Sequence, residues 1–79
     1  MKIEIYGYSK SDTETLLKLK EITFCITPDQ ALVLGAFFFQ CAEEMKVFGD
    51  SWDHKHFPGG GPSGDVIVSL LKKKKRRNK

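Results

Sequence analysis

The stretch that begins "TPDQ" at Thr27 constrains the fold of this 79-residue chain more than any other. It is typical of a helix N-terminus, because Thr27 can cap, the proline suits the first helical position and the aspartate suits the positive end of the helix dipole. Gln30 completes a capping box with Thr27. Gly49 is expected at the C-terminal end. The sequence therefore predicts one helix from Pro28 to about Phe48.

One face of this helix is expected to cover a sheet. Apolar residues recur on it every three or four positions, at Leu34, Phe38, Cys41, Met45 and Phe48. Other apolar side chains lie off this stripe, so the first half of the helix is apolar nearly all the way round. Such a patch indicates either a partner, including a second copy of the chain, or cover by the long loop after the helix. The candidate dimer patch consists of Leu32, Val33, Phe37 and Phe39.

Three strands are expected beside the helix. The N-terminal run "MKIEIYGYS" alternates with period two, and "LLKLKEITFCIT" changes phase between Leu19 and Ile22, which predicts a β-bulge near Lys20. A last strand is expected over "DVIVSLL". The predicted fold is α+β, in the order strand, strand, helix, strand. A right-handed crossover would give a three-stranded, mainly antiparallel sheet of order 2-1-3 with the helix packed on one face.

Composition is that of a small globular domain. The apolar content of 41% and the charged content of 29% are ordinary, and no apolar run approaches the ~20 residues of a membrane span. The N-terminus alternates from its first residues, unlike a signal peptide. We therefore expect residues 1–71 to form a single cytoplasmic domain without membrane association. Cys25 and Cys41 are too few for a disulfide scaffold, and both are expected to be reduced and buried.

The positive charge is concentrated at the C-terminus. The chain has a net charge of +3, but Lys72–Lys79 carries seven of its thirteen cations. Residues 1–71 therefore hold six lysines against ten acids, a net charge of −4. The like-charged tail is expected to be disordered. Binding of nucleic acid or another anionic surface through this tail is the alternative function from a different class.

The connector from Gly49 to Gly64 carries the residues that could form a site. His54 and His56 could bind a metal ion, but the chain has too few further ligands at recognised spacings, so no metal or cofactor is expected. Its serines lie in no catalytic signature, and its glycines lead into a strand rather than a helix, unlike those of a phosphate-binding P-loop. No catalytic residue and no enzymatic activity are expected.

Two interpretations of this connector remain open. In the first, Trp52 and Phe57 pin it onto the sheet or the helix end, and its histidines and acids are solvated. In the second it is a recognition surface, because tryptophan and histidine combine apolar area with polar groups and nearby acids would attract a basic partner. The candidate partner-binding residues are Glu43, Glu44, Asp50, Trp52, Asp53, His54, His56 and Phe57.

The order of these features resembles a known family. "ITFCITPDQ", "AFFFQCAEEM", "GDSWDHKHF", a Gly/Pro-rich loop and "DVIVSL" follow one another as in small bacterial immunity proteins of polymorphic toxin systems, immunity protein family thirty-two. The similarity covers roughly residues 1–70. It implies a cytosolic, non-enzymatic protein that binds a toxin domain, often a nuclease, and blocks it. The motif positions are Gly49, Asp50, His54, His56, Asp65, Ile67 and Val68.

Overall fold

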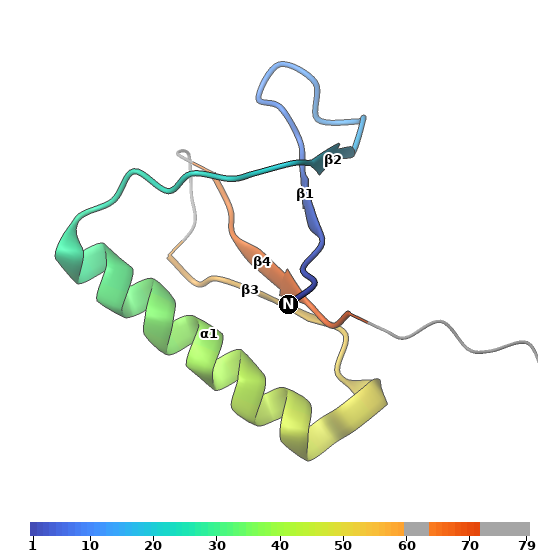
Figure 1. Cartoon of the computed structure of the whole chain (residues 1–79), viewed down its shortest axis with the longest axis vertical. Coiled ribbons are helices and arrows are strands. Elements are labelled where there is room, and N and C mark those ends of the chain that lie inside the picture. The colour runs from blue at the N-terminus through green and yellow to red at the C-terminus, as the bar shows by residue number, and fades with distance from the viewer. Residues whose placement is uncertain (60–63, 72–79) are drawn as a thin grey trace, which may run out of the picture.

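A computed structural model describes residues 1–59 and 64–71, which form one helix and two small antiparallel sheets (Figure 1). The predicted α+β class is confirmed for this part of the chain. The predicted tail, residues 72–79, lies outside the described residues. The elements in chain order are β1 (Ile5–Gly7), β2 (Leu17–Leu19), α1 (Pro28–Phe48), the 3-10 turn η1 (Gly49–Ser51), β3 (His54–His56) and β4 (Ile67–Ser69).

Helix α1 has the bounds that its local chemistry predicts. The side chain of Thr27 accepts a hydrogen bond from the backbone N–H of Gln30 at 3.1 Å, and the side chain of Gln30 accepts one from the backbone N–H of Thr27 at 2.9 Å. This is the capping box, and proline follows it at the first helical position. At the other end Gly49 has a φ of +57°, which other residues adopt only with strain.

The strand pairing differs from the predicted three-stranded sheet of order 2-1-3. β1 pairs with β2, whereas β4 pairs with β3 and not with β1. β3 lies in the connector from Gly49 to Gly64, where no strand was predicted. Only residues 57–66 separate β3 from β4, so their pairing costs less loop-closure entropy than pairing β4 with β1 at the other end of the chain.

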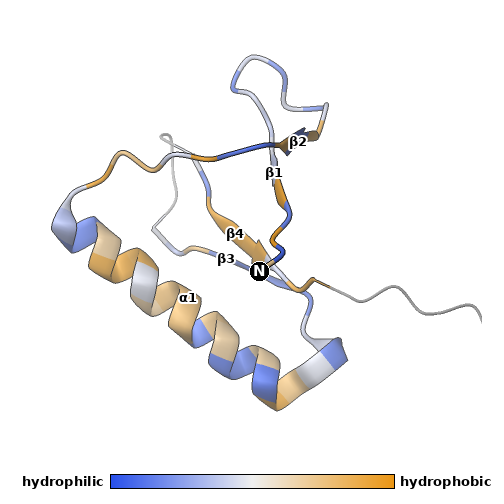
Figure 2. Cartoon of the chain, in the orientation of Figure 1, coloured by the Kyte–Doolittle hydropathy of each residue, from blue (hydrophilic) through white to orange (hydrophobic). Residues whose placement is uncertain are grey.

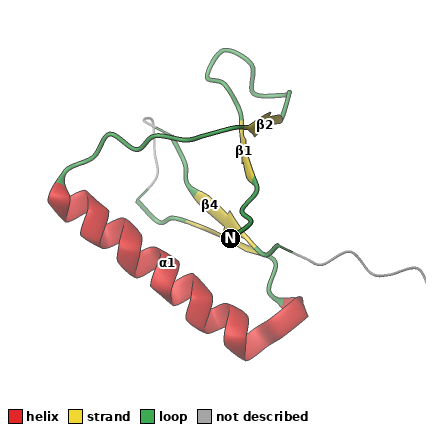
Figure 3. Cartoon of the chain, in the orientation of Figure 1, coloured by secondary structure: helices red, strands yellow, loops and turns green. Residues whose placement is uncertain are grey.

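The second predicted strand is paired over only part of its length. β2 ends at Leu19, the chain bends at Lys20, and residues 21–27 then run to α1 without helix or strand (Figure 3). The change of phase in the sequence thus marks the end of pairing, not a bulge inside a longer strand. Cys25 lies in this segment and is exposed, contrary to expectation, whereas Cys41 is buried as predicted.

The core is small and lies between α1 and the β3–β4 sheet. Phe37, Cys41 and Trp52 are its buried residues. The helix face was predicted to include Phe38, but Phe38 is 44% exposed and its neighbour Phe37 is 4% exposed. The residues that pack against the core are Met45, Phe57, Val68 and Leu70.

Most large apolar side chains of the described residues lie outside this core. Seventeen of them are exposed, against three buried apolar residues. Figure 2 shows hydrophobic stretches along the first half of α1 and in the segment that precedes it. Small chains with so few buried residues commonly depend on an additional support such as oligomerisation. The described part of the fold therefore leaves most of its large apolar side chains in contact with water.

Across the described residues, none of the helical structure is both long enough and apolar enough to traverse a lipid bilayer.

Candidate functional site

Glu44 of α1 holds the start of the connector in place. The indole Nε1 of Trp52 donates a hydrogen bond to Glu44 Oε1 at 3.0 Å, and Lys55 Nζ donates one to Glu44 Oε2 at 2.7 Å. The pairing with Lys55 and, after it, the hydrogen bond from Trp52 lower the pKa of the Glu44 carboxyl. Both carboxylate oxygens are engaged inside the fold, so Glu44 anchors β3 to the helix.

Trp52 and Phe57 flank β3 and face the core. Trp52 is 8% exposed, and the ring of Phe57 meets that of Phe37 edge-on, with centroids 5.3 Å apart. This geometry agrees with the first interpretation of the connector, in which Trp52 and Phe57 hold the connector against the helix. Neither presents a large free surface to a partner.

His54 and His56 project from the opposite face of the same strand. Lys55 reaches Glu44 on α1, so its two neighbours in β3 point away from the helix. Both histidines are exposed, and their rings meet edge to face at a centroid distance of 5.3 Å. His54 Nδ1 lies 2.7 Å from a carboxylate oxygen of Asp53.

The partner residues in β4 complete this face. His54 lies opposite Ser69 and His56 lies opposite Ile67, and both β4 residues are exposed. The intervening Val68 packs against the core instead. We call the surface formed by His54, His56, Ile67 and Ser69 the outer face of the β3–β4 sheet. Its backbone is fixed because the inner face is attached to α1.

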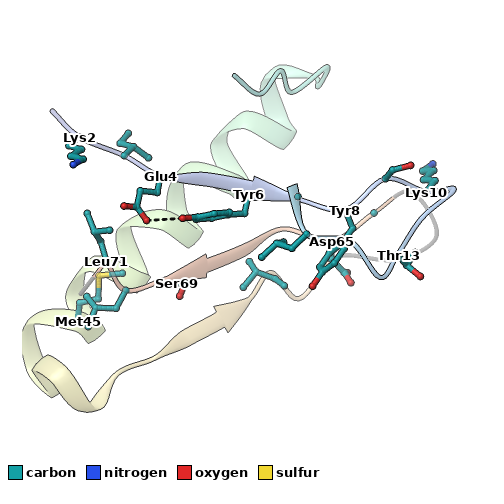
Figure 4. Close-up of a pocket in the computed structure, with 17 residues that line it drawn as sticks. Lys2, Glu4, Tyr6, Tyr8, Lys10, Thr13, Met45, Asp65, Ser69 and Leu71 are labelled. Carbon is teal, nitrogen blue, oxygen red and sulfur yellow. Dashed lines mark hydrogen bonds between the residues drawn. The ribbon is translucent and has the colours of Figure 1, made fainter. Parts of the chain in front are cut away.

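A cleft of about 1090 Å³ adjoins the outer face, between β1 and β4 (Figure 4). Tyr6 and Tyr8 line it from the β1 side, and Ile67 and Ser69 line it from the β4 side. The hydroxyl of Tyr6 donates a hydrogen bond to Glu4 at 3.1 Å. Sequence analysis had not proposed these tyrosines. In "EIYGY" they alternate with Ile5 and Gly7 and share the strand face of Glu4, and this pattern was the available signal that they lie on the polar side of the strand.

The remaining acidic candidates lie elsewhere. Glu43 follows Cys41 by two helical positions, about 200° around the axis, so it lies on the solvent side of α1 while Cys41 faces the core. Asp50 is exposed in η1, where the hydroxyl of Ser51 donates to the carbonyl of Phe48 at 2.7 Å. The structure brings Asp53 together with the two histidines, but it does not bring Glu43 to them.

The candidate dimer patch is also divided. Leu32, Val33 and Phe39 are exposed on α1, whereas Phe37 belongs to the core. The prediction for Phe37 was therefore wrong, because the turn of α1 that carries it faces Trp52 and Phe57.

The described residues place no three His, Cys, Asp or Glu side chains together as ligands for a metal ion. Comparisons with protein-family models, with curated proteins and with solved structures found no match for this chain. The resemblance to immunity proteins therefore stays a prediction.

Proposed function

We propose that this chain is a non-enzymatic protein-binding module that acts in the cytoplasm as an immunity protein, blocking a bacterial toxin by direct binding. The observation that carries the proposal is the outer face of the β3–β4 sheet. Its two histidines project from a strand whose other face is tied to α1 through Glu44. A surface held in this way loses little conformational entropy when a partner binds.

The chemistry of the surroundings supports a protein partner. Tyr6 and Tyr8 in the adjoining cleft offer large amphipathic side chains with few rotatable bonds, a property of many interface residues. Ile67 is 51% exposed and adds apolar area beside His56. This combination of aromatic, imidazole and aliphatic groups suits a recognition surface.

Charge favours a basic toxin, such as a nuclease. Residues 1–71 carry a net charge of −4. Complementary charge accelerates encounter with a basic partner. The basic tail brings the whole chain to +3, so the attraction of a basic partner is a local property of residues 1–71.

The proposal is tested by sequencing the genes beside the one that encodes this chain and co-expressing the chain with the product of a toxin gene found there. Wild-type protein should restore growth and bind the purified toxin. The double variant His54→Ala/His56→Ala should bind at least about tenfold more weakly, which corresponds to ~1.4 kcal/mol. The matched control is Glu14→Ala/Lys46→Ala, which also removes two exposed polar side chains but away from the outer face, and it should bind like the wild type.

Circular dichroism should show the same helix content for both double variants. Equal toxin affinity for the two would exclude the outer face of the β3–β4 sheet as the binding site. A wild-type protein that neither binds nor neutralises the toxin would overturn the function itself.

A further inference from the structure

Between β2 and α1 the chain presents a strand-like segment without a partner. Residues 21–27 read "EITFCIT", a sequence rich in the β-branched and aromatic residues that favour strands. All seven residues are exposed, and residues 21–26 make no hydrogen bond to any other described residue. The segment is therefore available for pairing along its backbone.

The side chains of this segment have the same character. Ile22, Phe24 and Ile26 alternate along it and are 50%, 42% and 42% exposed. In a strand these three would lie on one face. An apolar strip next to an unpaired backbone is the combination that a neighbouring strand covers best.

We propose that residues 21–27 form a homodimer interface, in which the segments of two copies pair antiparallel across a two-fold axis. An interface of this kind uses the same surface on both copies, so one such contact joins two chains. Pairing centred on Phe24 sets the two Phe24 side chains opposite each other and each Ile22 opposite Ile26 of the other copy. All six apolar side chains then form one continuous strip.

Charge selects the antiparallel direction. In this register each Glu21 lies opposite Thr27 of the other copy. The two Glu21 residues are therefore six residues apart along the strands, or about 20 Å at ~3.4 Å per residue. A parallel arrangement would place them side by side, which is destabilising. The antiparallel arrangement also brings Lys18 and Lys20, which precede the segment, toward Asp29, which follows it in the other copy.

Size sets the strength of the dimer. Stable protein–protein interfaces usually bury about 1,200 Å² or more, and a seven-residue strand pair buries less. The dimer should therefore dissociate on dilution. The interface shares no residue with the outer face of the β3–β4 sheet, so it stands or fails independently of toxin binding.

A cysteine scan tests the register. Cys25→Ser provides the background, because the other cysteine, Cys41, is buried. A single cysteine is then placed at each position from 22 to 26 in turn and oxidised with copper phenanthroline, and the cross-linked dimer is measured on non-reducing gels. The yield should peak at Phe24→Cys and fall at least about threefold at the positions on either side of it. Ser11→Cys, exposed in the β1–β2 connection, is the control for random collision.

Light scattering of the unmodified chain gives the second measurement. The mass should rise from 9.0 kDa toward twice that value as concentration increases. Phe24→Lys should keep the monomer mass, whereas Leu32→Lys, which adds the same charge on α1, should still dimerise. A mass that stays at 9.0 kDa up to ~1 mM, or a flat cross-linking profile, would overturn the proposal. Loss of the dimer in Leu32→Lys alone would assign the interface to the helix and equally overturn strand pairing.

Discussion

The position of the core can be tested by truncating two neighbouring aromatic residues of α1. Phe37→Ala should destabilise the fold strongly, because Phe37 is 4% exposed and contacts the ring of Phe57. Removal of a buried phenylalanine side chain costs about 3–5 kcal/mol. Phe38 is 44% exposed, so Phe38→Ala should cost about half of that or less. The two variants remove the same atoms from adjacent positions of one helix, and each is the control for the other.

Urea unfolding followed by the fluorescence of Trp52, the single tryptophan, measures the difference. Trp52 lies in the same core, so its emission reports loss of that core. The free energy of unfolding of a small domain is close to the loss expected for Phe37→Ala, so a Phe37→Ala protein that is already unfolded without denaturant gives no measurable midpoint. Phe37→Leu and Phe38→Leu then replace the alanine pair, with an expected difference of about 1–2 kcal/mol. If the Phe38 variants lose more stability than the Phe37 variants, the assignment of the buried face is wrong.

Two further predictions follow from single contacts. Lys55 and, after it, Trp52 lower the pKa of the Glu44 carboxyl. The ionised carboxylate therefore stabilises the fold fully above the usual carboxyl pKa of 4.5, and this stabilisation is lost as the pH falls through the lowered pKa. The urea midpoint of Glu44→Gln should therefore lie below that of the wild type at pH 7 and approach it in acid, and a pH-independent difference would contradict the ion pair. Burial raises the pKa of the Cys41 thiol, whereas Cys25 is exposed, so a thiol reagent should modify one cysteine at once and the second only on unfolding. Rapid modification of both in the folded protein, checked by mass spectrometry of peptides, would contradict the burial of Cys41.

Local chemistry was sufficient to predict the helix. The capping box at Thr27, the proline after it and the glycine at position 49 act through backbone groups within a few residues, so no distant contact is needed to define either end of α1. The strand character of residues 5–7, 17–19 and 67–69 was also predictable, since alternation is a local pattern. The α+β class follows from these elements together.

Strand pairing was not predictable from local patterns, because it depends on the relative cost of closing different loops. "HKH" alternates only between polar side chains and gave no hydrophobic signal for β3. The nearby Gly/Pro-rich stretch and the apolar run after it were the available hint of a hairpin. That hint was outweighed by the expectation that the last strand would return to the first.

The candidate site was predicted in its residues but not in its arrangement. The sequence identified the connector, with its histidines and aromatic residues, as the candidate binding region. Only the tertiary structure separated Trp52 and Phe57, which face the core, from His54 and His56, which face solvent. Alternation along β3 puts Phe57 on the same side as Lys55, which contacts Glu44 on α1, and the two histidines on the other side. Trp52 precedes β3 and is buried where the chain leaves the 3-10 turn.

The choice between Phe37 and Phe38 has the same origin. Both lie three or four positions from Cys41, so helical periodicity admits either as part of the buried face. The sequence by itself therefore determined the helix and the strand character of residues 5–7, 17–19 and 67–69, but not β3, because those preferences arise from each residue and its near neighbours. The tertiary structure alone decided which sides of them are buried, because burial depends on surfaces that distant parts of the chain bring into contact.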